Sequence, residues 1–374
     1  MSQTKAQLVS GTTAQDLTVD NINTTSINSA QPSGRRNLII NGAMTVSQRG
    51  TSFASTHNTY SLDRFLLEKE NNAANFTITQ STTSPDGFSK SLKVDCTAAD
   101  TSTASNEFVT FRYKIEAQDL QHLSFGTSAA KPLVLSFYVR SNVTGTYAVN
   151  CLQRDNSSKL YTRNYTIDSA DTWERKTISI PADTSGVIND DNGSGLEIYI
   201  PLVMGSTYSS GSQSTTAWET FANSKFAAGH AVNVLSNTSN EWYLTGLQLE
   251  VGSTATDFEH RRFGEELALC ERYHQRIGAF TGVASNTTTM QGGIDFRVPM
   301  RATPSASLVP TTARVTDTSH ADYEASSATV TINNSSDLGL RVSISGFSGL
   351  TTQRTMVFQP SGTSFSVLHL SAEL

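Results

Sequence analysis

The sequence predicts an all-β protein: a jelly-roll β-sandwich, then a linking helix and a small C-terminal β-sandwich, with an extended segment at the N-terminus. Three observations support this fold class. Apolar and polar residues alternate over many short segments, as in Leu133-Val-Leu-Ser-Phe-Tyr-Val-Arg140, which is typical of half-buried strands. Turn-forming Gly, Pro, Asn and Asp residues separate these segments. The clearest helical spacing occurs at residues 261–277, so one helix is expected between two β regions.

Residues 1–36 are predicted to form an extended attachment segment. They are rich in Ser, Thr, Asn and Gln, and apolar residues such as Leu17, Val19 and Ile22 are sparse. So few apolar side chains cannot offset the conformational entropy that ordering the segment costs. We therefore expect the segment to order only against copies of itself or another protein, with Leu17, Val19 and Ile22 as candidate interface residues.

Residues 37–260 are predicted to form the larger sandwich. Its strands are marked by alternating apolar residues, which include Phe76 and Ile78, Leu92 and Val94, Tyr147, Val149 and Cys151, Ile178 and Ile180, and Leu196, Ile198 and Ile200. In one strand the alternation changes phase between Leu244 and Leu247. A β-bulge at Thr245-Gly246 would return both sets of apolar residues to the same face.

A linking helix is predicted at 261–278, with Gly278 as its end. Its apolar stripe packs against the sandwich or against copies of itself at an oligomer axis, and consists of the candidate interface residues Phe263, Leu267, Cys270 and His274. Residues 279–374 are predicted to form the small C-terminal β domain, for distal receptor contact or trimerisation. The apolar content of this domain is lean, so we expect part of its core to be shared between subunits.

The composition excludes several functional classes. The net charge is −6 and basic residues do not cluster, so nucleic acid is not an expected partner. The chain lacks a signal-peptide pattern and has no apolar stretch near the ~20 residues of a membrane helix, so neither membrane insertion nor ordinary secretion is expected. Cys96, Cys151 and Cys270 are odd in number and far apart, which favours three buried thiols in a protein that folds in a reducing cytoplasm.

No catalytic residue, metal site or cofactor is predicted. The seven histidines are scattered without metal-ligand spacing, and no nucleophile-elbow motif occurs. Glu107, Glu197 and Glu250 lie in predicted strands, so a carboxylate pair for glycoside hydrolysis stays open. Strand carboxylates that face solvent are the commoner outcome.

The segment from Gly205 to His230 is the candidate binding surface. It exceeds an ordinary connection in length and is dense in Ser, Thr and Gly. Its aromatic residues Tyr208, Trp218 and Phe221 lie among hydroxyl and amide groups, the combination that a sugar-binding surface requires. The alternative, which the sequence favours, is that these rings staple the loop to its own sandwich or to a neighbouring subunit.

The chain resembles a known family over most of residues 37–304, and several short stretches carry this resemblance. Asn37-Leu-Ile-Ile-Asn-Gly-Ala-Met44 with Tyr60-Ser-Leu-Asp-Arg-Phe65 resembles the opening of the carbohydrate-binding-module-like jelly roll of phage tail proteins. The run from Trp242 to Gly252, with Phe258-Glu-His-Arg261 and Cys270-Glu-Arg-Tyr273, resembles the last strand and exit helix of that domain. Pro299-Met-Arg-Ala-Thr-Pro304 is similar to the opening of the small β domain that often follows, and Leu17-Thr-Val-Asp-Asn-Ile22 is similar to marine cyanophage fibre proteins.

The resemblance implies a fibre subunit of a phage virion, most simply a tail fibre, that assembles in the host cytoplasm as a homotrimer. Its N-terminus would attach to other virion proteins, and its partner on the host surface would be a glycan or a protein. The resemblance transfers no catalytic residue. A head-associated fibre or decoration protein, a non-viral glycan-binding adhesin and a glycan depolymerase stay open as alternatives.

Overall fold

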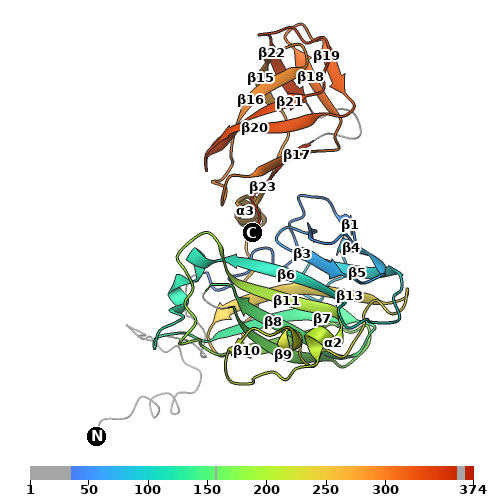
Figure 1. The fold of residues 1–374 in the computed structure, drawn as a ribbon, viewed down its shortest axis with the longest axis vertical. Coiled ribbons are helices and arrows are strands. Elements are labelled where there is room, and N and C mark those ends of the chain that lie inside the picture. The colour runs from blue at the N-terminus through green and yellow to red at the C-terminus, as the bar shows by residue number, and fades with distance from the viewer. Residues whose placement is uncertain (1–34, 156–157, 360–366) are drawn as a thin grey trace, which may run out of the picture.

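The computed structural model describes residues 35–155, 158–359 and 367–374 of the chain. These residues form a larger β-sandwich and a smaller β domain, with helix α3 (Phe263–Glu271) and the last residues of the chain between them (Figure 1). The predicted fold class is confirmed. Apart from Arg35 and Arg36, the predicted attachment segment lies outside the described residues, and so do its candidates Leu17, Val19 and Ile22.

Two antiparallel sheets pack face to face in the larger sandwich. The six-stranded sheet has the order β1 (Ser52–Ala54), β4 (Asn75–Ser81), β5 (Ser91–Ala98), β13 (Glu241–Val251), β7 (Leu133–Ser141) and β10 (Glu174–Ile180). The seven-stranded sheet has the order β12 (Glu219–Thr220), β9 (Lys159–Ile167), β8 (Gly145–Gln153), β11 (Ser194–Met204), β6 (Phe108–Glu116), β3 (Leu66–Glu70) and β2 (Thr59–Tyr60). The connections contain the short helices η1 (Ala117–Leu123), α2 (Ser206–Ser209) and η2 (Asn223–Lys225).

The alternating residues that predict the strands form the core of this sandwich. One buried cluster draws on both sheets and contains every predicted strand residue, namely Phe76, Ile78, Leu92, Val94, Leu133, Leu135, Phe137, Val139, Tyr147, Val149, Cys151, Ile178, Ile180, Leu196, Ile198 and Ile200. The three cysteines are buried free thiols, as predicted. Within the described part of the chain, no helix is long and apolar enough to span a bilayer.

The predicted β-bulge in β13 is confirmed. The register of β13 against β7 shifts between Thr245 and Gln248. Gly246 has a φ of 64°, a backbone conformation that glycine adopts without steric cost. The shift lets the apolar side chains on both sides of the bulge face the core, since Leu244 and Leu247 are both fully buried.

The predicted linking helix is wrong in its second half. Helix α3 ends at Glu271, and strand β14 (His274–Ile277) takes the place of the last helical turn. β14 pairs with β23 (Val367–Ser371), a partner distant in sequence that helical spacing cannot reveal. Gly278 therefore does not end a helix, and His274 is a strand residue rather than part of a helical stripe.

The smaller domain combines two further sheets. A three-stranded sheet has the order β14, β23 and β17 (Ser305–Val309). A seven-stranded sheet has the order β19 (Asp322–Ala325), β18 (Ala313–Asp317), β22 (Thr355–Gln359), β15 (Phe280–Ala284), β16 (Thr289–Asp295), β21 (Gly339–Ser345) and β20 (Thr329–Ser335).

The smaller domain has a buried core of its own within the chain. The described residues bury a cluster of their own that joins both sheets, with Met290, Val342, Met356, Phe358 and Leu368 among its members. The low apolar content is compatible with this closed core because the outer faces of the strands carry Ser, Thr, Gln and Arg. That part of this core is shared between subunits stays a prediction.

Charged side chains tie the two domains together at their junction. The guanidinium group of Arg64 pairs with the Glu373 carboxylate, which Arg49 also contacts at 3.0 Å. Arg301 donates to the main-chain oxygens of Ala372 and Glu373 and, on the side of the larger sandwich, to that of Asn192. The last residues of the chain are thus held between the domains.

Candidate functional site

The outward face of the seven-stranded sheet carries a row of alternating charges. Glu68 on β3, Arg112 on β6, Glu197 on β11 and Arg154 at the end of β8 follow one another across four neighbouring strands. Arg112 bridges two of them, since its Nη1 lies 2.8 Å from Glu68 Oε1 and its Nη2 donates to Glu197 Oε1. Arg154 closes the row with Nε 2.7 Å from Glu197 Oε2. We call these four residues the charge row.

Glu197 is the fixed anion of the charge row. Burial alone raises the pKa of this carboxyl group, but the guanidinium groups of Arg112 and Arg154 and the Tyr199 hydroxyl outweigh that effect and hold the pKa below its usual value. Both carboxylate oxygens are fully engaged, because Ser194 and Tyr199 donate to them in addition to the two arginines. Glu197 is therefore ionised at neutral pH and is poorly suited to donate a proton.

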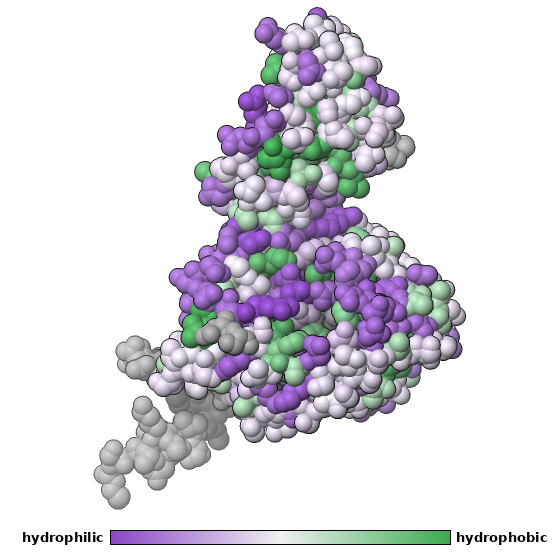
Figure 2. Space-filling model, viewed as in Figure 1, coloured by the Kyte–Doolittle hydropathy of each residue, from purple (hydrophilic) through white to green (hydrophobic). Residues whose placement is uncertain are grey.

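The segment between β11 and β13 covers the other half of this face with aromatic rings. Phe226 lies at the centre of the group, with its ring 4.7 Å from that of Tyr199 and 6.4–6.5 Å from those of Tyr208 and Phe221. The Tyr208 ring in turn packs edge-on against Phe108 of β6 at 5.2 Å. Figure 2 shows this side of the sandwich, where a row of hydrophilic residues runs beside a hydrophobic patch.

A pocket of about 150 Å³ opens where the charge row meets the rings. Its lining combines apolar and polar groups, and consists of Glu68, Phe108, Leu152, Arg154, Tyr199, Tyr208, Phe221, Asn223 and Phe226. Arg154 is exposed and Phe221 is 37% exposed, so both side chains are accessible at the mouth. This concave site with apolar walls and a few polar groups has the general make-up of a small-ligand site.

The structure brings together two of the three sequence-predicted binding residues. Tyr208 and Phe221 line the pocket, whereas Trp218 does not. The Trp218 ring is buried against Phe125 and Tyr161, and its indole Nε1 donates to the carbonyl of Pro181 at 2.8 Å. Trp218 thus staples the loop to the sandwich, and its prediction as a sugar-contacting residue is corrected.

Sequence reasoning missed the residues that the sheet supplies. Glu197 and Tyr199 alternate with buried Leu196, Ile198 and Ile200, so their outward direction was visible in the pattern. Glu68 lies on β3 and Arg154 directly follows β8, and the strand order alone brings both to one pocket. The pairing of charges across the sheet therefore needed the three-dimensional structure.

Glu107, Glu197 and Glu250 are all buried, although Glu197 lies on the outer face of its sheet and Glu107 directly precedes β6, so the expectation of solvent exposure is corrected. Glu107 accepts a hydrogen bond from the Ala104 amide at 2.5 Å. Glu250 is held by Gln248 and Thr256 in the six-stranded sheet. Each carboxylate has its own partners, on different parts of the sandwich.

The fold leaves some of the predicted interface residues of the linking segment accessible and buries the others. Phe263 is 60% exposed at the start of α3, and Leu267 one turn later is half-buried beside the junction. Cys270 and His274 are buried within the chain, so neither can contact a second copy in this fold. Their candidacy is corrected, which leaves the exposed Phe263 and the half-buried Leu267 as apolar side chains that can contact a second copy.

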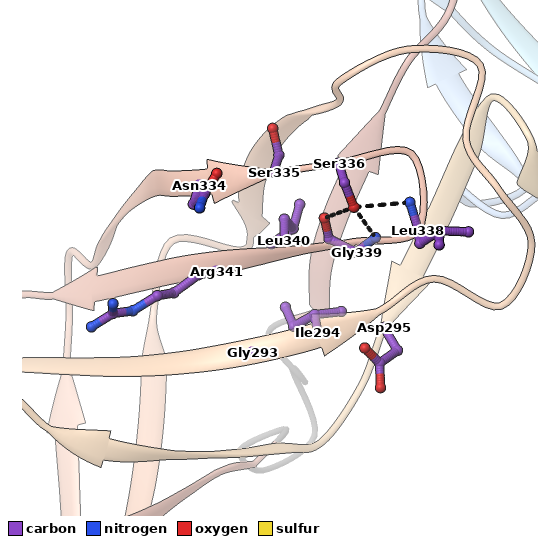
Figure 3. Close-up of a pocket in the computed structure, with 10 residues that line it drawn as sticks. All are labelled: Gly293, Ile294, Asp295, Asn334, Ser335, Ser336, Leu338, Gly339, Leu340 and Arg341. Atoms are coloured by element: carbon purple, nitrogen blue, oxygen red, sulfur yellow. Dashed lines mark hydrogen bonds between the residues drawn. The ribbon is translucent and has the colours of Figure 1, made fainter.

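A second depression, of about 360 Å³, lies on the smaller domain between β16 and the β20–β21 turn (Figure 3). Ser336 in its lining serves the turn itself, since Ser336 Oγ accepts from the amides of Leu338 and Gly339 and donates to the Gly339 carbonyl. Arg341 beside it donates to Gln291. Across residues 35–155, 158–359 and 367–374, no group of three or more His, Cys, Asp or Glu side chains is placed to hold a metal ion.

No protein-family description matches the sequence, and no curated protein is similar to it. Among solved structures, the chain is similar to the enzymatically active domain of tailspike protein 4 of bacteriophage CBA120, with 11% identity and a TM-score of 0.31. That match covers 57% of this chain and 21% of the tailspike chain.

Two carbohydrate-binding modules are also similar. The family 11 module of a cellulosomal cellulase of Clostridium thermocellum shares 10% identity at a TM-score of 0.28, over 56% of this chain and 96% of that chain. TmCBM61 in complex with β-1,4-galactotriose shares 6% identity at a TM-score of 0.29, over 58% of this chain and 99% of that chain. The function of this chain has to be inferred from its own site.

Proposed function

We propose that this chain is a non-enzymatic glycan-binding subunit of a phage fibre, and that it binds sugar at the pocket on the seven-stranded sheet. The observation that carries the glycan-binding part is the meeting of aromatic rings and charged hydrogen-bonding groups in one concave site. Sugars present apolar C–H faces to rings and hydroxyl groups to polar side chains. The pocket offers both at once, from Tyr208, Phe221 and Phe226 on one side and Glu68 and Arg154 on the other.

The electrostatics of the site favour binding over hydrolysis. Glycoside hydrolases require one carboxylic acid that is protonated at the working pH, which a raised pKa provides. The pKa of Glu197 is shifted in the opposite direction, and Glu68 is paired with Arg112 at 2.8 Å. These two carboxylates are therefore better placed to organise arginines than to transfer protons.

The fibre role rests on the sequence resemblance and on the two-domain arrangement. The stretches that resemble phage tail proteins contribute the opening residues and β13 of the larger sandwich, and part of α3 beside it. A host-contacting smaller domain on a sandwich platform fits a virion subunit attached through its N-terminal segment. A head-associated fibre or decoration protein, or a non-viral adhesin, would use the same site in the same way.

Retention on a host polysaccharide tests the binding site. In affinity electrophoresis with purified host surface polysaccharide, we expect Tyr208→Ala and Phe221→Ala to weaken retention about fivefold or more, since truncation of a central aromatic costs at least ~1 kcal/mol of binding free energy. Tyr138→Ala is the matched control, because this half-buried ring lies on the outward face of the opposite sheet. Equal retention of all three variants would contradict the site, and shortening of the polysaccharide would show hydrolysis instead.

Light scattering tests the proposed oligomer. We expect the full chain to be an oligomer, and a trimer if the resemblance holds, because Phe263 exposes a large apolar ring beside half-buried Leu267 on α3. A chain that begins at Arg35 is the comparison, since Arg35 and Arg36 contact Glu265 and Glu259 and should stay. We expect at most partial loss of the oligomer on this truncation. A full chain that is monomeric at micromolar concentration would contradict the proposal.

A further inference from the structure

The charge row leaves one acceptor and one donor unused at the pocket. Within the described part of the chain, Glu68 takes one hydrogen bond on Oε1 from Arg112 and none on Oε2. Arg154 uses Nε for Glu197 and Nη2 for the Tyr199 hydroxyl, and its Nη1 has no partner among the described residues. Both side chains line the pocket. A ligand in the pocket can therefore meet a free carboxylate oxygen and a free guanidinium nitrogen.

These two groups lie on either side of the aromatic surface. β3 and β8 are separated by β6 and β11, so their backbones stand about 14 Å apart at ~4.8 Å per strand spacing. Between them lie the rings of Phe108 and Tyr199, with Tyr208, Phe221 and Phe226 above. A ligand that reaches both Glu68 and Arg154 has to rest its body on these rings.

The size of the pocket suits a body of one ring. Its volume is about 150 Å³, and an engineered protein cavity of roughly this volume holds one benzene molecule. One six-membered sugar ring fits such a space. A stack of two or more ring units does not.

The charges favour an uncharged ring. Two carboxylates and two guanidinium groups in the charge row sum to zero, so the site has no net attraction for an anion. The side-on edge of Arg154, Nε and Nη2, through which an arginine grips a carboxylate with two parallel bonds, is already taken by Glu197 and Tyr199. A sugar carboxylate would also add a second negative charge near Glu68. A hydroxyl group, in contrast, can donate to Glu68 and accept from Arg154.

We propose, resting on the glycan-binding function above, that the pocket recognises a single neutral pyranose unit, with hydroxyl groups bonded to Glu68 Oε2 and Arg154 Nη1 and the ring face on the aromatic group. The ligand class is thus a neutral hexose at a chain end or side branch, and sugar acids bind more weakly. The specificity comes from the alternating order of the charge row rather than from an excess of either charge.

Saturation-transfer NMR of the full chain with monosaccharides tests this proposal, since a ligand of this size binds on the order of millimolar. The probes are glucose, galactose and mannose, each beside its matched uronate. We expect at least one neutral hexose to bind, with its uronate at least tenfold weaker. Glu68→Gln should reduce that preference, because it removes the repelling charge and keeps the shape. Glu70→Gln, the next outward residue of β3 and outside the pocket, is the control and should leave the preference unchanged.

The other outcomes distinguish a failure of this inference from a failure of the proposed function. A uronate that binds as tightly as its neutral hexose would overturn the preference for neutral sugar while glycan binding stands. Polysaccharide retention that depends on Tyr208, without binding of any monosaccharide, would overturn the single-unit pocket and indicate a longer site. Absence of both kinds of binding would reject the proposed function itself.

Discussion

Replacing Glu373 by alanine is expected to lower the free energy of unfolding by about 3–5 kcal/mol, because the substitution leaves a buried guanidinium group without its counter-charge. Arg64 is 1% exposed, and its Nη1 is paired with Glu373. Burial alone would lower the pKa of Arg64, but Glu373 and the neighbouring tyrosines outweigh burial and raise it, so the group stays charged. It also contacts the Lys114 carbonyl at 2.6 Å and the rings of Tyr273 at 3.4 Å and Tyr113 at 5.5 Å, none of which carries a compensating charge.

Urea unfolding of the full chain measures this effect, with Glu265→Ala as the matched control. Glu265 also pairs with an arginine, Arg35, but the side chains are 38% and 58% exposed, so its loss should cost no more than ~1 kcal/mol. Replacing the buried pair as a whole, by Arg64→Met with Glu373→Leu, should recover part of the stability, because no unpaired charge remains. Similar losses for Glu373→Ala and Glu265→Ala would show that the junction does not depend on this pair.

The strands were the part of the fold that the sequence predicts well. In a sandwich with one face of each sheet buried, the period of two is enforced along every strand, and Leu133, Leu135, Phe137 and Val139 show it without interruption. Even the phase slip in β13 was interpretable, because a bulge that needs a positive φ is marked by Gly246. Local pattern and tertiary packing agree at these positions.

The helix prediction is wrong where the local pattern and the tertiary strand pairing conflict. Residues 263–271 form a helix, but His274–Ile277 have amide and carbonyl groups that pair with β23. Nothing in the sequence of residues 272–277 indicates that partner, since β23 lies at the other end of the smaller domain in sequence. The same reason explains the error about Cys270, whose burial depends on how α3 packs at the junction.

Only the aromatic half of the candidate site could be predicted from the sequence, for a comparable reason. The aromatic residues of the loop could be found from composition alone, and Tyr208 and Phe221 do line the pocket. Which rings stay accessible depends on what lies beneath the loop, and Trp218 happens to reach the Pro181 carbonyl. The polar half comes from four strands whose order no local signal encodes.

Acidification is expected to destabilise the protein well above the pH at which carboxylates titrate, because three imidazoles are held neutral. Burial lowers the pKa of His230 to about 4, that of His369 to about 4 and that of His274 to about 2. His274 Nε2 lies 3.1 Å from His369 Nδ1, so one ring donates and the other accepts. A second proton on this pair would place two cations side by side near Arg49 and Arg276, which also lower the pKa of both rings.

The sign of this effect follows from where the protons bind. In the unfolded chain these histidines titrate near pH 6.5, so below that pH the unfolded state binds protons that the folded state does not. The stability that the neutral rings contribute is therefore present above pH 6.5 and is lost as the pH falls toward the folded-state pKa values near 4. His230 is 7% exposed and by itself accounts for about 1.5 kcal/mol between pH 6.5 and 5, since the slope rises toward ~1.4 kcal/mol per pH unit below the unfolded pKa. Asp63 acts in the opposite direction, because burial raises its pKa.

Urea unfolding at pH 7, 6 and 5 checks this prediction, in a window where unfolded carboxylates stay ionised. We expect a steep loss of stability in the wild-type chain and a shallower one in His230→Gln, which removes one buried titrating ring. His57→Gln is the control, since the His57 side chain is 48% exposed and should leave the slope unchanged. A stability that stays constant from pH 7 to 5 would mean that the junction and the sheet accommodate charged imidazoles. His230 would then have to be solvated through the loop that carries Tyr208 and Phe226, which would make that loop, and the pocket it covers, far more open than its packing indicates.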